Sequence, residues 1–277
     1  MEKKKSVKNA YRIIYLLLLL ALPAVLSGCM SKDEKLMREL REDGIAFMKE
    51  GDNSAAIVRF DQALSLNSGK VTEVEKDILL YRAEAEVLTG DYGAADYTYS
   101  LLLKEEPDNT AYKDLRVICM VQSGGDLNKA LEMYKKADEE DPLSEGHRKA
   151  LYQLGAALSA SGNADHAALA RELYAEAVER NGGATAELYN RMGSISFQDG
   201  DYDKALEYIN AGIDLIVNDP ENEEAAVLQS LEYNRIICYE YKQEYRKALK
   251  YFETYQKEYG TDDIVDHEKA FLESRVK

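Results

Sequence analysis

Cys29 is the residue whose surroundings point most clearly to chemistry. It follows an apolar run over residues 13–26 and the small residues at 27 and 28, and a lysine-rich segment precedes the run. A basic start, an apolar run and small residues are the layout of a secretory signal peptide. The run is shorter than the roughly 20 residues that a membrane-spanning helix needs, and Pro23 would kink it. We therefore expect an export signal rather than a permanent transmembrane helix.

The end of this segment, Leu26-Ser27-Gly28-Cys29, resembles the bacterial lipobox. The resemblance implies that the Cys29 thiol receives a diacylglyceryl group and that cleavage makes Cys29 the mature N-terminus. It predicts a lipoprotein signal peptide over 1–28 and a lipidated tether over 29–36. Two acyl chains, at about 0.8 kcal/mol per buried CH₂, suffice for stable anchoring. The expected location is the bacterial cell envelope, on the exported side of the cytoplasmic membrane or at the outer membrane of a Gram-negative cell. The alternative is an ordinary secreted protein with a chance cysteine near its cleavage site.

Signatures of catalysis or metal binding are thin in the remaining sequence. The histidines are His147, His166 and His267, and none of them lies near another candidate ligand along the chain. No metalloprotease HExxH, GxSxG, P-loop or dinucleotide-binding motif is present. Cys119 and Cys238 lie too far apart in the expected fold for a disulfide and are expected to be buried free thiols. The sequence thus predicts a non-enzymatic protein with no cofactor and no metal.

The composition favours a folded, all-α chain that does not bind nucleic acid. Of 277 residues, 45% are hydrophobic and 31% charged, which is enough apolar material for a core. Four prolines and 20 tyrosines favour long helices with tyrosine contacts. The formal net charge is −16 and falls to −20 without residues 1–28, so the chain repels nucleic-acid phosphates and anionic membrane faces. Membrane attachment must then come from the lipid.

A repeated pattern of small and aromatic residues organises the chain from residue 37 onward. In the first copy Gly44 and Phe47 share one helix face, Gly51-Asp52 breaks the helix, and Ala56 and Phe60 share a face of the next helix. Each copy therefore predicts a helical hairpin. The alanine at the position of Ala56 returns in five further copies, at Ala95, Ala130, Ala170, Ala205 and Ala248.

This pattern resembles the tetratricopeptide repeat, whose period is 34 residues. The larger spacings here indicate insertions, one of them in the turn at 164–167, and the second copy departs from the pattern with Ala83 and Glu86. The resemblance implies an all-α fold: a right-handed superhelical solenoid of about six helical hairpins over 37–260, with a C-terminal capping helix over 261–277.

In this family the first helices of the hairpins line a concave groove in which peptide partners lie. Carried over by position, the resemblance places aromatic, amide and aliphatic side chains there: Tyr112, Leu115, Gln122, Tyr152, Ser159, Asn190, Phe197, Tyr233, Ile237 and Tyr241. Tyrosines suit peptide recognition because they offer contact area with few rotors to freeze, although any one of them could instead pack between repeats.

The functional expectation is a membrane-anchored scaffold that holds a protein or peptide partner in its groove, in envelope assembly, secretion or cell-wall organisation. The alternative is a receptor lipoprotein that captures a small ligand such as a glycan or a peptide nutrient.

Overall fold

A computed structural model describes residues 31–66, 71–139, 141–180, 182–219, 224–260 and 263–276, and the expected signal peptide and lipid-attachment residue Cys29 lie outside them. These residues form thirteen α-helices and no strand, which confirms the all-α fold class for the described part of the chain. The helices are α2 (Lys32–Glu50), α3 (Asn53–Leu64), α4 (Glu73–Thr89), α5 (Tyr92–Glu105), α6 (Thr110–Gln122), α7 (Leu127–Asp138), α8 (Glu145–Ala160), α9 (Ala164–Glu179), α10 (Ala186–Gln198), α11 (Tyr202–Val217), α12 (Ala225–Tyr241), α13 (Tyr245–Tyr259) and α14 (Asp263–Val276).

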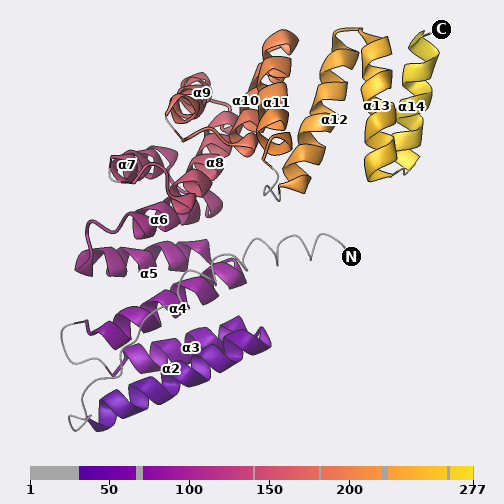
Figure 1. Cartoon of the computed structure of the whole chain (residues 1–277). Helices are drawn as coiled ribbons and strands as arrows, with labels where there is room; N and C mark the ends of the chain where they lie inside the picture. The colour runs from indigo at the N-terminus through magenta and orange to yellow at the C-terminus, as the bar shows by residue number, and fades with distance from the viewer. Residues whose placement is uncertain are drawn as a thin grey trace.

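The helices pair into hairpins that stack one on the next along a curved array (Figure 1). Each helix packs against its successor, and first helices of successive hairpins also touch, as α6 touches α8 and α10 touches α12. At the bend of the array α7 and α9 lie on the outer side and α8 on the inner side (Figure 1). The stacking confirms the solenoid that the repeat pattern predicts. None of the described helices is both long enough and apolar enough to span a membrane.

The hairpin turns follow from a glycine and an acidic residue placed side by side. Gly51 ends α2 at φ 85°, in the left-handed region where a side chain would be strained. Asp52 then caps α3, because its side chain accepts a hydrogen bond from the backbone N–H of Ala55 at 3.0 Å. The same pair recurs as Gly90-Asp91 between α4 and α5. The chain therefore reverses direction where the sequence predicts.

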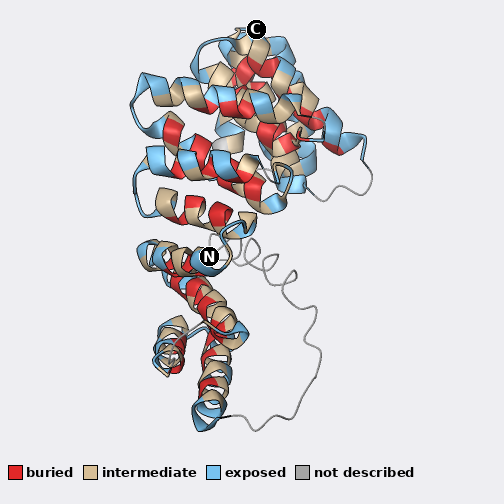
Figure 2. Ribbon diagram, turned by 90° about the vertical axis from the view of Figure 1, so that its left-hand side faces the viewer, coloured by how far each residue is buried: buried red, intermediate tan, exposed pale blue. Residues whose placement is uncertain are grey.

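Small residues allow close contact inside each hairpin. A Cβ on Gly44 would lie 2.3 Å from Cε1 of Phe60, and a Cβ on Gly155 would lie 2.3 Å from the hydroxyl oxygen of Tyr174. Phe60 and Tyr174 are buried, as is Ala56. Buried residues occur in helices along the whole described stack (Figure 2). Each aromatic ring therefore occupies the volume that the facing glycine leaves free.

The second hairpin keeps this geometry with different residues. Ala83 is fully buried at the glycine position, and Glu86 is buried at the aromatic position. The Glu86 carboxylate accepts a hydrogen bond from the Thr98 hydroxyl at 2.7 Å and lies 3.3 Å from the Arg82 guanidinium. Burial raises the pKa of Glu86, and these two partners partly oppose that shift. A hydrogen-bonded polar group thus replaces the ring in this repeat.

Two boundaries differ from those expected. The residues 164–167, expected as an insertion in a turn, form the first turn of α9, because Asn163 caps the helix there through the backbone N–H groups of Asp165 and His166. The tether expected over 29–36 is helical from Lys32 onward, because Ser31 caps α2 and Glu34 adds a negative charge to its first turn.

The final helix α14 packs on α13 and closes the end of the stack. Its Leu272 is fully buried in one cluster with Ile236, Ala248 and Phe252 of the last hairpin. This is the C-terminal capping helix that the sequence predicts.

Candidate functional site

The candidate groove is the surface formed by the first helices of the third to sixth hairpins. The structure places Tyr112, Leu115 and Gln122 on α6, Tyr152 and Ser159 on α8, Asn190 and Phe197 on α10, and Tyr233, Ile237 and Tyr241 on α12. Each of the four helices contributes through one face, since side chains three, four or seven residues apart lie together on a helix.

Ser159 and Asn190 share a cavity of about 360 Å³ between α8 and α10. Ser194, Gln198 and the pair formed by Glu187 and Arg191, whose charged atoms are 2.7 Å apart, also line it, and the cavity is open to one side. Hydroxyl and amide groups here supply both donors and acceptors. Such a lining matches the N–H and C=O groups of a peptide backbone.

Amide side chains also connect neighbouring first helices. The Asn190 carbonyl accepts a hydrogen bond from the Asn234 amide of α12 at 2.8 Å. The Gln122 amide of α6 donates to the Gln153 carbonyl of α8 at 2.7 Å. These bonds link α6 to α8 and α10 to α12 along the groove.

An aromatic cluster lies where α10 and α12 end. Phe197 meets Tyr241 edge to face with ring centroids 4.9 Å apart, and Tyr202 of α11 lies 5.3 Å from Phe197 and 5.7 Å from Tyr241. Tyr241 remains 57% exposed. The cluster therefore offers an exposed ring that its neighbours hold in place.

Tyr152, expected to contact a partner in the groove, instead makes close contacts with residues of its own chain. Its hydroxyl hydrogen-bonds the Thr185 hydroxyl at 2.6 Å, and the Arg191 guanidinium lies 4.9 Å from its ring centroid. Burial raises the pKa of the Tyr152 phenol. The residue thus joins α8 to the start of α10, and the cavity that Ser159 and Asn190 share is lined by other residues.

The remaining expected groove residues also contribute to helix packing. Tyr112 stacks on Tyr99 with centroids 6.4 Å apart, and Leu115 packs against the core cluster that contains Tyr99. The Tyr233 ring lies 5.6 Å from that of Tyr255, and Ile237 is half-buried. The structure therefore joins Ser159 with Asn190 and Phe197 with Tyr241, and leaves Tyr112 and Leu115 apart from both groups.

Four groove residues, Tyr202, Arg191, Ser194 and Gln198, were not expected from the sequence. Ser194 and Gln198 follow Asn190 at intervals of four, which places the three on one face of α10 and is a usable signal. Tyr202 belongs to the second helix of its hairpin, whereas the family resemblance places only first-helix residues in the groove.

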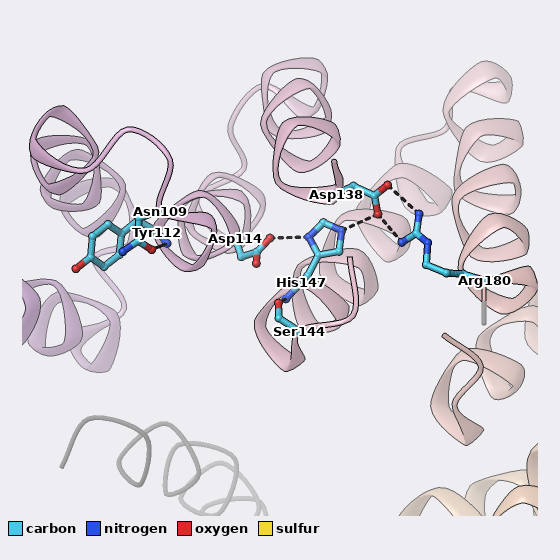
Figure 3. A network of polar contacts seen from close by, with 7 residues as sticks. All are labelled: Asn109, Tyr112, Asp114, Asp138, Ser144, His147 and Arg180. Carbon is cyan, nitrogen blue, oxygen red and sulfur yellow. Dashed lines mark hydrogen bonds and ion pairs between the residues drawn. The ribbon is translucent and has the colours of Figure 1, made fainter. Parts of the chain in front are cut away.

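No candidate ligand adjoins a histidine along the chain, but the fold brings two carboxylates to His147. This residue is 1% exposed, and its Nδ1 lies 2.8 Å from Oδ1 of Asp114 while its Nε2 lies 3.1 Å from Oδ1 of Asp138 (Figure 3). Arg180 donates two hydrogen bonds to Asp138, at 2.7 and 2.9 Å, and the Tyr134 ring stacks on the imidazole at 4.2 Å. Stacking of successive hairpins brings these residues together, although Asp114 and His147 are 33 positions apart.

Burial and neighbouring charges act in opposite directions on the two carboxyl groups. Burial raises the pKa of Asp114, and the contact with His147 only partly offsets it. Burial would also raise the pKa of Asp138, but hydrogen bonds and attraction from Arg180 and His147 outweigh it and lower that pKa. Asp138 is thus the firmly ionised member of the pair.

Cys119 and Cys238 are free and buried, as expected. Burial raises the pKa of Cys238 to about 11 and that of Cys119 to about 12, which keeps both thiols protonated and unreactive at neutral pH. Within the described residues no group of three or more histidine, cysteine or acidic side chains is arranged to hold a metal ion.

Comparison with solved structures supports the fold. A tetratricopeptide repeat protein from Parabacteroides merdae is 19% identical, with a TM-score of 0.57 over 79% of this chain and 78% of its own. PilW, a type IV pilus biogenesis factor, is 12% identical, with a TM-score of 0.57 over 84% of this chain and 98% of its own. The apo quorum sensor NprR from B. thuringiensis is 12% identical, with a TM-score of 0.56 over 98% of this chain and 75% of its own. At these identities the likeness shows the fold alone.

No curated protein sequence matches the chain significantly. The tetratricopeptide repeat family model matches residues 42–110 and 152–223, about half of the chain. These two stretches cover the first two hairpins and the fourth and fifth hairpins, where the facing pairs Gly44 with Phe60 and Gly155 with Tyr174 occur. The chain therefore belongs to the tetratricopeptide repeat family, a family of helical scaffolds for protein interaction.

Proposed function

We propose that this protein is a lipid-anchored scaffold on the exported side of a bacterial membrane and that it holds a protein or peptide partner in the groove of its first helices. The observation that carries the groove is the cavity between α8 and α10, where Ser159, Asn190, Ser194 and Gln198 converge. The exposed ring of Tyr241 provides an apolar contact on the neighbouring first helix α12. A polar cavity near a held aromatic ring suits a peptide that presents both backbone groups and an apolar side chain.

The anchor rests on the sequence Leu26-Ser27-Gly28-Cys29 at the end of an apolar run. With a net charge of −20 after removal of 1–28, the folded body would be repelled by anionic membrane faces and would stand away from the bilayer. This arrangement leaves the groove accessible to partners in the cell envelope. The likeness to a type IV pilus biogenesis factor is compatible with a role in envelope assembly and extends to the fold only.

Site-specific crosslinking in cells tests the groove. A photo-crosslinking benzoylphenylalanine at Gln198, which lines the cavity, should give a discrete adduct with one protein. The matched control is the same group at Val58, which is 53% exposed on the second helix α3. Adducts of the same pattern from both positions would exclude the groove as the binding surface. A small molecule, and no protein, retained at Gln198 would support the ligand-receptor alternative.

A further inference from the structure

The geometry of His147 fixes the number of protons in the cluster formed by Asp114, Tyr134, Asp138, His147 and Arg180, here called the His147 cluster. Both ring nitrogens lie within hydrogen-bond distance of a carboxylate oxygen, at 2.8 and 3.1 Å. A neutral imidazole has one N–H and one lone pair, so it donates to only one of the two carboxylates. The second contact requires one further proton, on the ring as imidazolium or between Nδ1 and Oδ1 of Asp114.

With this proton in place the charges of the cluster balance. The additional proton brings one positive charge to His147 and Asp114, and Arg180 carries a second. These two charges balance the negative charges of the Asp114 and Asp138 carboxylates. Without it, a ring lone pair faces a carboxylate oxygen in an interior where such repulsion is strong. Further charged groups that act on the cluster are Asp141 in the turn before α8, which faces Asp114, and Glu176 of α9, which faces Tyr134.

Only one end of the cluster reaches solvent. A hollow of about 270 Å³ between α7 and α9 is lined by Asp138 and Arg180, and these two side chains keep 27% and 30% of their surface exposed. At the other end Asp114 is 1% exposed, and its Oδ2 is buried with no hydrogen-bond partner among the described residues. Protons can therefore exchange from the side of Asp138, while the charge of Asp114 is stabilised chiefly by His147.

The cluster spans the junction of two hairpins. Asp114 and Asp138 belong to α6 and α7 of the third hairpin, His147 belongs to α8, and Arg180 follows α9 of the fourth (Figure 3). We propose that the His147 cluster is a proton-dependent lock that holds the fourth hairpin on the third while the additional proton is bound and loosens this junction when the proton leaves.

The direction of the pH effect follows from where the proton is bound. The folded junction retains a proton that the separated groups release at lower pH, so its contribution to stability is present at low and neutral pH and is lost as pH rises. Because α8 also carries Tyr152 and Ser159, loosening would change the groove; this last consequence rests on the proposed function.

The sharpest test is Asp114→Asn, which should remove the need for the proton and keep the contacts. The Asn amide can donate to a neutral His147 Nδ1, leaving the Nε2–H to donate to Asp138. We expect the melting temperature of the wild-type protein to fall between about pH 6 and about pH 10, and that of Asp114→Asn to fall clearly less. The matched control, Asp199→Asn, alters an exposed pair with Arg171 and should follow the wild type. Parallel curves for all three proteins would overturn the proposal.

Two further measurements protect the test against a variant that does not fold. His147→Gln removes the imidazole that contacts both carboxylates and should flatten the curve, whereas His166→Gln, which changes a histidine outside the cluster, should not. Hydrogen exchange of the wild-type protein needs no variant. Between about pH 6 and about pH 10, protection of amides in α8 should fall about tenfold more than in α2 and α3, which corresponds to about 1.4 kcal/mol of lost stabilisation at the junction. Equal loss in both regions would overturn the lock.

Discussion

Gly155 sets how closely the two helices of the fourth hairpin approach. A Cβ there would lie 2.3 Å from the hydroxyl oxygen and 2.4 Å from Cζ of Tyr174, whose ring is buried and has little room to move. Gly93 on α5 provides a contrast, because a Cβ there would meet only the Asp91 side chain at 3.8 Å. The two glycines lie in helices but differ in the space around them.

The change Gly155→Ala should therefore lower the free energy of unfolding by about 1 to 3 kcal/mol through overpacking. Gly93→Ala should raise it by roughly 0.5 to 1 kcal/mol, since alanine favours the helix and fits the space. Urea unfolding of both variants checks the pair. A higher free energy of unfolding in both variants would show that Tyr174 yields and that close approach is not required.

Tyr241 and Tyr174 separate binding from packing, because Tyr241 is 57% exposed and Tyr174 is 2% exposed. Tyr241→Ala should weaken binding of the crosslinked partner by about 1 to 3 kcal/mol while changing stability by under about 0.5 kcal/mol. Tyr174→Ala should lower stability by roughly 3 kcal/mol by leaving a cavity. Tyr152 is a less selective probe, since its hydroxyl bonds Thr185. Affinity measurements and thermal melts of the variants distinguish the two roles. A lower melting temperature with unchanged affinity in Tyr241→Ala would show that this ring packs the fold and does not bind the partner.

At the scale of elements, α14 is attached by contacts that include a buried leucine and a pair of acidic side chains. Leu272 fills the cluster of the last hairpin, and Glu268 of α14 meets Glu240 of α12. Burial, together with the hydrogen bond and charge of Glu268, raises the pKa of Glu240 to about 7. A protonated Glu240 can therefore donate a hydrogen bond to the Glu268 carboxylate and hold this side of α14.

Attachment of α14 should weaken as pH rises through about 7. The folded pKa of Glu240 lies above the value of about 4.3 expected for an unfolded chain, so the stabilisation is complete below that value and is lost on deprotonation. Glu268→Gln should reduce this dependence, because an amide can donate to the ionised Glu240 and carries no charge, while the effect of burial remains. Glu273→Gln, on an exposed position of the same helix, is the control. Hydrogen exchange of α12–α14 at acidic and alkaline pH measures the effect; unchanged dependence in Glu268→Gln would contradict it.

At the scale of the whole molecule, a repeat array that contacts only its neighbours distributes stability along its length. The acidic body and the basic leader have opposite charges, and the formal charge changes from −16 to −20 when residues 1–28 are removed. The proposed lipid is then the feature that holds the body at the membrane.

Cys29→Ser should abolish lipid attachment and leave unprocessed precursor, because serine lacks the thiol that accepts the diacylglyceryl group. Metabolic labelling with a fatty-acid probe provides the measurement. Cys119→Ser serves as the matched control, since Cys119 is buried in the folded body and should not carry lipid. Equal label on Cys29→Ser and on the wild type would refute the lipobox interpretation.

The sequence by itself determined the hairpins, the solenoid and the capping helix, for a local reason. Helix faces follow a short period and the turns need a residue such as Gly51, so both can be read within one repeat. Residues on one helix face, such as Asn190 and Ser194, are likewise predictable as neighbours. The burial of Glu86 is not predictable from its own repeat position, because it depends on the hydrogen bond from Thr98 of the next helix.

Only the tertiary structure decided which repeats meet through polar side chains. His147 meets Asp114, and Tyr152 meets Thr185, across separations of 33 residues in both cases. The rotation and spacing between hairpins set these contacts, and they depend on the packing of every side chain at the interface. The repeat pattern predicts that neighbouring hairpins stack, but it does not predict which side chains come into contact between them. The groove cavity and the His147 cluster could therefore be recognised only once the hairpins were in place.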